Sequence, residues 1–297
     1  MSAPLRAMLL MAAFAALWAA IEALGALVLH RYSPYQVVWV RYAVHLAVML
    51  AVWGWRQPRS LVGTRRPAFQ LARSLLMLGM PASWIIGMQS GMAPSTLMCV
   101  FWLNPLLILL LAWIFLHERI APRLWIATAG AACGAVLLHP PERLEAVPLL
   151  VLPLAMALCF SLYVVMTRSL RTESTRTNLF YTALGVFLAL TPAMPGLWVT
   201  PEPFDALVMC AIGVLGLAAL YLIDRMAAAA PVSVSAPFAY LQIVAAAAIT
   251  LMAGMELHFS VRRIVVGVLL IVGAALYLWL RESRSSVPAA ATARIAQ

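Results

Sequence analysis

The chain alternates between long apolar runs and short connectors that carry Pro, Gly and Arg. Ten runs can be distinguished, at roughly 7–29, 35–54, 69–89, 94–116, 124–139, 147–167, 178–199, 205–223, 231–253 and 262–280. Most approach the roughly 20 residues that a helix needs to cross a bilayer at about 1.5 Å per residue. The pattern therefore predicts an all-α integral membrane protein with ten transmembrane helices.

Two of these runs carry an amide side chain near their middle. Asn104 follows Trp102 by two residues, and Gln242 follows Tyr240 in the same way. Lipid offers no hydrogen-bond partner to such a side chain. In the first run Pro105 also removes a backbone N–H, whereas Ile243 stands at the matching position of the second run, so the two interruptions need not be equivalent. Paired polar interruptions of hydrophobic helices are typical of a binding site between two halves of a transporter.

The two halves of the chain repeat each other. Matches at a spacing of 137 or 138 residues pair Gly79 with Gly216, Trp84 with Tyr221, Pro94 with Pro231, Trp102 with Tyr240, Asn104 with Gln242, and Glu118 with Glu256. In the opening helices Trp18 corresponds to Tyr163. Because each half holds an odd number of helices, the second repeat must be inverted in the membrane. We expect repeats at 1–145 and 146–280, followed by a disordered cytoplasmic tail at 281–297.

Composition and charge set the class and the orientation. A chain that is 65% hydrophobic and 10% charged has too much apolar surface for a soluble domain. The net charge of +10 would suit nucleic acid, but the arginines lie in short loops, where they act as topology signals. With a cytoplasmic N-terminus, fifteen of the twenty arginines, Arg73 among them, fall on the cytoplasmic side. Both termini are therefore expected inside, with no nucleic-acid partner.

No motif for catalysis or for a cofactor is present. The four cysteines lie inside apolar runs without paired spacing, which is typical of buried thiols rather than a metal site. The sequence also lacks a phosphate-binding glycine loop and the zinc-protease and serine-hydrolase motifs. We therefore expect no catalytic residues, no metal and no cofactor.

Polar and aromatic residues within the spans are the candidates for substrate binding. The expected set is Trp18, Trp84, Trp102, Asn104, Tyr163, Tyr221, Tyr240 and Gln242. The amides would hydrogen-bond substrate, and the aromatic rings would hold an ammonium group or stack on a side chain. Interhelical hydrogen bonding by the amides and core packing by the rings are the alternative interpretations.

Glu22 and Arg41 carry opposite charges within the membrane. Each lies about 10 Å from the outer end of its helix, so equal depth on adjacent antiparallel helices predicts an ion pair. His45 lies one turn beyond Arg41 and is a candidate proton relay, with a neutral packed histidine as the alternative. Glu118 and Glu256 lie at helix ends, where we expect them to anchor a turn or to pair with Arg119, Arg123, Arg262 or Arg263.

The sequence resembles the drug/metabolite transporter superfamily and its EamA-type domain. The resemblance is carried by Ser33-Pro34, Arg41, Ala93-Pro94, Asn104-Pro105, His117-Glu118-Arg119, Gly130 and Gly134, and again by Ala230-Pro231, Glu256, Gly267 and Gly273. The Trp-rich centre is most similar to the YddG-type aromatic amino acid exporters. The resemblance implies a multi-pass exporter of metabolites in the cytoplasmic (inner) membrane.

Together these observations predict a secondary transporter that exports small zwitterionic metabolites. Amino acids, aromatic ones included, would cross through a midplane cavity by alternating access. The expected partners are an amino acid substrate and membrane lipids, and the protein is expected to be a monomer. A phosphorylated substrate should require several cations in the cavity. Arg41 is the only cation expected deep in the membrane, so such substrates are disfavoured. The alternatives are export of other small metabolites or drugs, a channel, and a membrane-embedded lipid-handling enzyme.

Overall fold

The structure is a computed structural model that describes residues 1–55, 57, 59–142, 147–254 and 260–295. The described residues form helices and connectors, with no strand among them. Within this part of the chain, nine helical spans are long and apolar enough to cross a membrane, and Pro122–Leu138 is a shorter apolar helix. The expected all-α, multi-pass membrane fold is confirmed.

The first half supplies five apolar segments, the fourth of which is interrupted. They are α1 (Ala3–Val28), α2 (Pro34–Met49), α4 (Pro67–Gln89), the pair α5 (Pro94–Phe101) and α6 (Asn104–Leu116), and α7 (Pro122–Leu138). A π-helical turn at Leu50–Gly54 and the short α3 (Arg59–Val62) follow α2. Several of these helices begin at a proline, whose fixed backbone angle suits a first turn and whose missing N–H leaves no donor unpaired.

The second half follows the same order. A 3₁₀ turn (Val147–Leu150) leads into α8, and another (Thr191–Ala193) joins α9 to α10. The main helices are α8 (Val151–Ser169), α9 (Thr175–Leu190), α10 (Met194–Leu197), α11 (Pro203–Ala229), α12 (Val232–Ser235), α13 (Leu241–Met252) and α14 (Val261–Ile295). A 3₁₀ segment at Ala236–Tyr240 connects α12 to α13. The helices match the ten runs expected from hydropathy.

Helix packing exchanges the two halves. α1 packs on α11 and α13 of the second half, and its counterpart α8 packs on α4 and α6 of the first. The second helices, α2 and α9, contact each other, and so do the fifth helices, α7 and α14. This reciprocal pattern is what a pair of related halves requires. The boundary predicted near residue 145 lies among residues that the structure does not describe.

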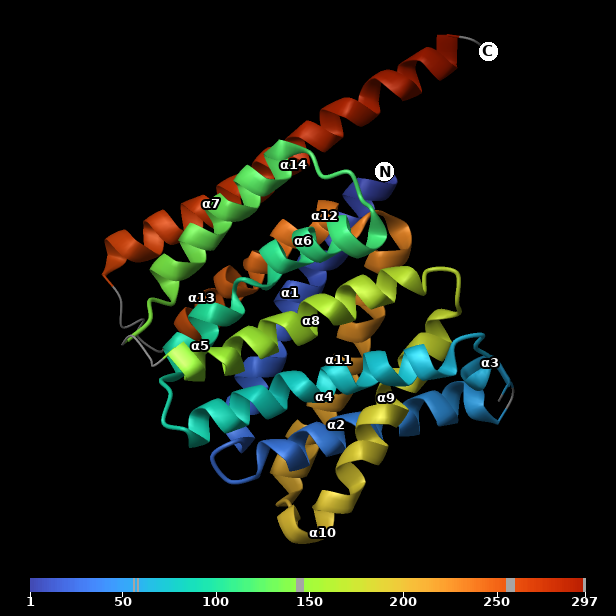
Figure 1. The fold of residues 1–297 in the computed structure, drawn as a ribbon, viewed down its shortest axis with the longest axis vertical. Coiled ribbons are helices and arrows are strands. Elements are labelled where there is room, and N and C mark those ends of the chain that lie inside the picture. The colour runs from blue at the N-terminus through green and yellow to red at the C-terminus, as the bar shows by residue number, and fades with distance from the viewer. Residues whose placement is uncertain (56, 58, 143–146, 255–259, 296–297) are drawn as a thin grey trace.

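The fifth helices lie side by side along one edge of the bundle (Figure 1). A Cβ atom on Gly134 would lie 2.7 Å from the backbone oxygen of Gly267, and one on Gly267 would lie 2.7 Å from Leu138. Both values are below ordinary contact distance, so only glycine permits this approach of the two backbones.

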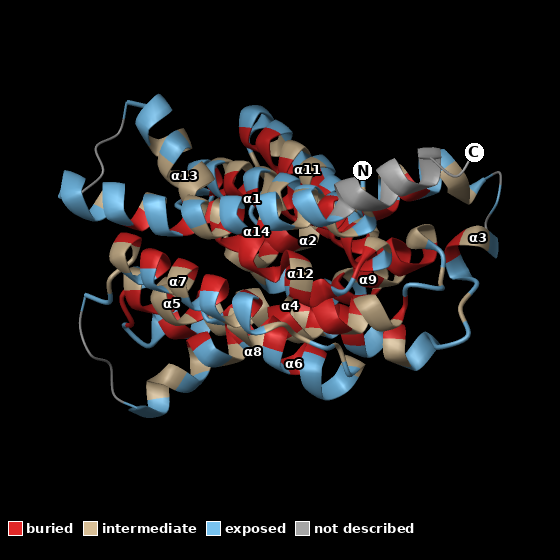
Figure 2. Ribbon diagram, turned by 90° about the horizontal axis from the view of Figure 1, so that it is seen from above, coloured by how far each residue is buried: buried red, intermediate tan, exposed pale blue. Residues whose placement is uncertain are grey.

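Burial separates the faces of the helices. Buried residues gather where the helices face one another, and exposed residues cover the outside (Figure 2). The C-terminal part of α14 projects beyond the bundle in Figure 1. This helix ends at Ile295, and the disordered tail expected from residue 281 stays a prediction.

Candidate substrate-binding site

The first interruption lies where the sequence predicts it. α5 ends at Phe101, Trp102 and Leu103 form a turn, and α6 begins at Asn104. The Nδ2 atom of Asn104 donates to the carbonyl oxygen of Phe101 over 2.9 Å. This bond satisfies a carbonyl at the end of α5, which lipid could not do.

The second interruption is longer and begins earlier. Pro237 lies at the start of the 3₁₀ segment that precedes α13, so this run also has a proline at its break. Sequence comparison at Ile243 missed it because the two prolines are not at matching positions. The Tyr240 hydroxyl donates to the Trp102 carbonyl oxygen over 2.8 Å, and the two rings lie 6.0 Å apart. The two interruptions therefore meet in the core.

A cavity of about 390 Å³ lies between α1, α2, α4 and α5, with one residue each from α8 and α11. Its walls come from the second half of α1 and the first half of α2, so it lies toward the end of the bundle formed by residues 29–33 and 90–93, here called the cavity end. The lining side chains include Trp18, Ile21, Glu22, Leu29, Val37, Val38, Arg41, Met77, Met80, Trp84, Met98, Phe101, Met156 and Ile212.

Glu22 and Arg41 are the charged residues among these lining side chains, and they do not bond to each other. The Glu22 carboxylate accepts a hydrogen bond of 2.9 Å from Nε2 of Gln242 on α13. Arg41 lies over the Trp18 ring at 5.5 Å and over the Tyr42 ring at 4.8 Å, and its Nε has no hydrogen-bond partner. The predicted direct ion pair is therefore wrong. Equal depth did not place the side chains together because Gln242 and Trp18 engage them separately.

Three of the expected midplane residues line a second, narrow pocket. Trp102, Asn104 and Gln242 border a space of about 10 Å³ that shares Trp18, Met80 and Phe101 with the cavity. Trp84 lines the cavity itself. Five of the eight expected substrate-binding residues thus lie at one of these two connected spaces.

The remaining three lie elsewhere. Tyr163 is buried against the Arg73 guanidinium, 5.0 Å from its ring, and Tyr240 is buried in its bond to Trp102. Tyr221 is 48% exposed on the outer face of α11. Leu207 and Val214, at intervals of seven residues along this helix, are exposed as well, so the stripe faces lipid. The assignment of Tyr221 to substrate binding is wrong.

His45 is buried and packs edge-on against Tyr42, with ring centroids 4.9 Å apart. It does not line the cavity, and neither ring nitrogen has a hydrogen-bond partner in the described part of the chain. The proton-relay role stays a prediction, without a hydrogen-bonded path that leads from the cavity to this ring.

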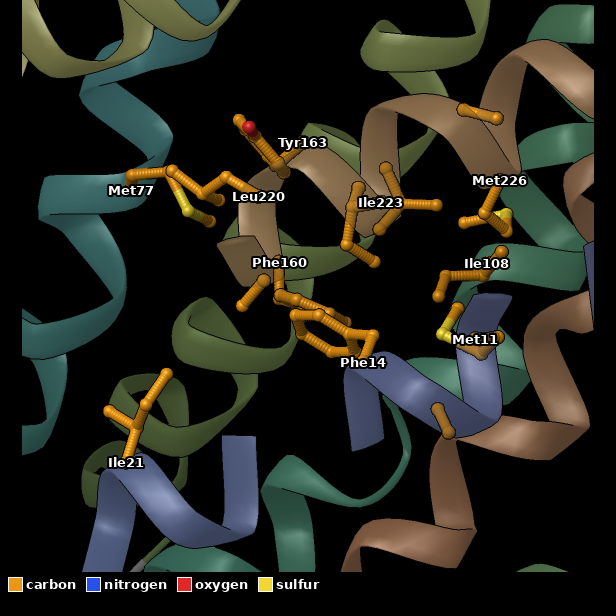
Figure 3. Close-up of a cluster of buried hydrophobic side chains, with 14 of the residues drawn as sticks. Met11, Phe14, Ile21, Met77, Ile108, Phe160, Tyr163, Leu220, Ile223 and Met226 are labelled. Atoms are coloured by element: carbon orange, nitrogen blue, oxygen red, sulfur yellow. The ribbon is translucent and has the colours of Figure 1, made fainter. Parts of the chain in front are cut away.

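Apolar side chains close the inner end of the cavity. Phe14 of α1 stacks on Phe160 of α8 with ring centroids 6.0 Å apart, and Met11 and Ile108 pack beyond them (Figure 3). The opposite end of the bundle, formed by residues 117–121 and 170–174, is here called the sealed end. Among the described residues, these apolar side chains lie between the cavity and the sealed end.

Arg73 lies deep in the sealed end, contrary to its expected place in a cytoplasmic connector. It is 1% exposed, six residues into α4. Its guanidinium donates to Thr167, Thr182, the Gln70 side chain and the Asn178 carbonyl oxygen over 2.7–3.0 Å. Counting arginines near run ends missed this because Arg73 and Gln70, three residues apart, share an inward helix face.

Asn178 extends this network to an acidic residue. Its amide accepts from Gln70 over 2.6 Å and donates to Asp224 of α11 over 2.7 Å. The network thus joins α4, α8, α9 and α11 through neutral groups, with a buried cation at one side and a carboxylate at the other. Sequence analysis passed over Asp224, although an acid at the edge of an apolar run was a signal for it.

Glu118, which follows the end of α6, binds the start of α12. Its carboxylate accepts from the backbone N–H groups of Val232 and Ser233, each over 3.1 Å, and from the Ser233 hydroxyl over 2.6 Å. Arg168 lies 4.0 Å away and donates to the Ala227 carbonyl oxygen over 2.6 Å. Glu118 therefore anchors a turn, as expected, but in the other half of the chain. Glu256 lies outside the described residues.

At the cavity end, charged residues join the connector after α1 to α11. Arg31 pairs with Glu202 at 3.1 Å and with Asp205 at 3.2 Å, and the Tyr32 hydroxyl donates to Asp205 over 2.8 Å. The hydrogen bond to Asp205, together with the attraction of Glu202, raises the pKa of Arg31 above its ordinary value. These contacts fix the rim beside the cavity. In the described part of the chain, no cluster of His, Cys, Asp or Glu could hold a metal ion.

The fold is that of a multi-pass membrane protein with a central cavity. Residues 5–139 match the EamA-like transporter family, so the first half of the chain carries the EamA-type transporter domain that the sequence resembles. A solved crystal structure shares the fold, with a TM-score of 0.79 at 21% identity over 94% of this chain and 98% of its own.

Curated relatives have a common name. A protein of Rickettsia bellii is 26% identical over 76% of this chain and 77% of its own length, and one of Rickettsia felis is 24% identical over 86% of each. Both are named S-adenosylmethionine uptake transporter. The likeness to YddG-type exporters stays a prediction.

Proposed function

We propose that the protein carries zwitterionic amino acid derivatives with a further positive charge, of the S-adenosylmethionine type, across the cytoplasmic membrane. The observation that carries the proposal is that Glu22 and Arg41 face one cavity without pairing. A substrate with separated negative and positive groups would neutralise both charges. Charged groups within a membrane protein are costly and are commonly retained for such roles.

The cavity wall suits each part of this substrate. Arg41, held flat by Trp18 and Tyr42, offers the planar donor set that binds a carboxylate. Glu22 lies among Trp18, Trp84 and Phe101, where a carboxylate and aromatic faces together attract an ammonium or sulfonium group. The four methionines of the lining adapt to varied side chains. The volume falls within the range of about 300–1,000 Å³ for small-molecule pockets.

Aromatic amino acids are the second candidate substrate, and the Trp-rich lining favours them. They share the carboxylate and ammonium groups but have no second cation. With the N-terminus inside, as the arginine distribution predicts, the cavity faces the outer side. Rocking of the two halves about the sealed end would expose it to the inner side. The relatives are named for uptake, so we do not propose the export direction that was expected from the sequence. We also propose that the protein functions as a monomer in the lipid bilayer.

Transport by purified protein in liposomes tests the proposal. Labelled S-adenosylmethionine, methionine and tryptophan are compared in both directions, with S-adenosylhomocysteine as a competitor that lacks one methyl group and the sulfonium charge. We expect saturable flux of S-adenosylmethionine and competition that is at least about tenfold weaker by S-adenosylhomocysteine, because a hydrogen-bonded or paired charge contributes about 1.5–3 kcal/mol.

Matched variants assign the two charges. Glu22→Gln should weaken S-adenosylmethionine about tenfold and methionine less, whereas Arg41→Gln should weaken every substrate with a carboxylate. Arg263→Gln, on the exposed start of α14, is the control and should behave as the wild type. Absence of saturable flux for all three substrates in both directions would overturn the proposal.

A further inference from the structure

The narrow pocket beyond the cavity contains two polar atoms without partners. Nε1 of Trp102 and Oδ1 of Asn104 are buried and make no hydrogen bond within the described chain. Both residues line the pocket of about 10 Å³ that shares Trp18, Met80 and Phe101 with the cavity. An unpaired buried polar atom is destabilising, so two in one pocket call for an explanation.

The chemistry of these two atoms is fixed. The indole N–H of Trp102 can only donate. Asn104 Nδ2 already donates to the Phe101 carbonyl oxygen over 2.9 Å, so the amide cannot turn over without losing this bond, and Oδ1 is left to accept. The pocket therefore presents one donor and one acceptor. All of its lining side chains are uncharged, including Gln242, whose amide donates to Glu22.

We infer that this pocket is a hydrogen-bonding subsite for the uncharged end of the substrate. The matching ligand group has an acceptor atom beside an N–H donor, as on the edge of an amino-substituted aromatic heterocycle. Its ring would lie at the junction between Trp18, Met80 and Phe101, and its edge would reach Trp102 and Asn104. Aromatic neighbours favour a planar ring over an aliphatic amide.

This subsite rests on the proposed function, because the charged end of the same molecule would remain at Glu22 and Arg41. It adds selectivity that charge alone does not give. A site built to hydrogen-bond a substrate group rejects an analogue that lacks the group, since its own buried atoms are then left unpaired. In the absence of substrate, the pocket has room for about one water molecule.

Binding of three sulfonium compounds to the purified full-length protein tests the inference. S-adenosylmethionine presents the amino group and ring nitrogen. S-inosylmethionine has a carbonyl oxygen in place of that amino group and an N–H in place of the adjacent ring nitrogen, so its donor and acceptor are exchanged. S-methylmethionine has no heterocycle. We expect the wild type to bind S-adenosylmethionine at least about tenfold more tightly than S-inosylmethionine.

Two variants connect the selectivity to the pocket. Trp102→Phe should weaken S-adenosylmethionine about tenfold, and Asn104→Leu should remove the preference over S-inosylmethionine. Neither should change the affinity for S-methylmethionine, which also reports that each variant is folded. The subsite is overturned if Trp102→Phe leaves S-adenosylmethionine affinity unchanged or if the wild type binds the inosyl compound equally well. If the wild type binds none of the three compounds, the proposed function is contradicted, and the subsite with it.

Discussion

At the cavity end of the bundle Glu22 and Arg41 face open volume, whereas at the sealed end Arg73 and Glu118 are surrounded by hydrogen-bond donors and acceptors. Both ends bury charge in an apolar bundle. At the sealed end, four oxygen atoms from three helices take up the hydrogens of Arg73. At the cavity end, Arg41 makes one long hydrogen bond, from Nη2 to the Tyr42 hydroxyl over 3.4 Å, while Nε of both arginines is without a partner in the described chain.

The difference separates structural charges from binding charges. A saturated charge holds helices together and gains nothing from a ligand. A charge with few bonds can still gain partners when a ligand arrives, so part of its cost in the empty state is recovered on binding. The total number of buried charges would not have distinguished the two ends, but the number of bonds that each charge makes does.

Replacement of Arg73 should have the largest effect of these changes, on the stability of the sealed end. Arg73→Leu removes the donor to the side-chain oxygens of Gln70, Thr167 and Thr182. Each buried acceptor left unpaired costs about 1–3 kcal/mol, so we expect a loss of stability of about 3 kcal/mol or more. Thermal unfolding in detergent, followed by tryptophan fluorescence, measures it. Arg59→Gln, on the exposed α3, is the control; an equal unfolding midpoint for both variants would show that the network carries no stability.

Neutralising Glu118 should loosen the sealed end. Glu118→Gln keeps the shape but removes the charge that three donors share at α12. Charge-assisted bonds of this kind contribute about 1.5 kcal/mol or more, so opening should become about tenfold more frequent. The measurement is maleimide labelling of Ser235→Cys, buried behind Glu118, in a background without native cysteines.

Labelling of Ser285→Cys, exposed on α14, is the matched control and should not change. If Glu118→Gln leaves the labelling rate at Ser235→Cys unaltered, the carboxylate is not what closes this end. The same assay applied to Glu22→Gln should give the wild-type rate, because Glu22 lies at the cavity end.

Tyr240→Phe should have the smallest effect, because it removes one hydrogen bond between the ends rather than a charge at either. Loss of the bond to the Trp102 carbonyl oxygen should lower stability by about 0.6–1.5 kcal/mol. Tyr221→Phe removes a hydroxyl from the exposed face of α11 and serves as the control. Identical unfolding midpoints for the two variants would mean that the contact between the interruptions is not stabilising.

Hydropathy predicted the helices and the first interruption, because apolar length and the Asn104-Pro105 pair are local signals. It could not orient the side chains. α1 and α6 are apolar on all sides, so nothing in their patterns shows which face is inward. Tyr221 was assigned to the cavity from its repeat partner, Trp84, and instead faces lipid.

The partners of the polar residues were equally out of reach. Glu22 and Arg41 line one cavity, yet Gln242, 220 residues from Glu22 in sequence, is the hydrogen-bond partner of Glu22 in place of the arginine. Arg73 was read as a topology signal because its depth depends on partners from α8 and α9. Such pairs are set by tertiary packing, which one sequence does not encode in any local spacing.

The contact between Gly134 and Gly267 has a consequence for how relatives of this chain can vary. A Cβ atom at either position would meet the backbone oxygen of the other glycine, at 2.7 or 3.0 Å, and backbone cannot turn aside as the end of a side chain can. A methyl group added at either position is felt at once by the opposite helix, so each residue restricts the other although 133 positions separate them. Across relatives these two sites should change together or not at all, as a correlated pair that joins the two halves of the chain.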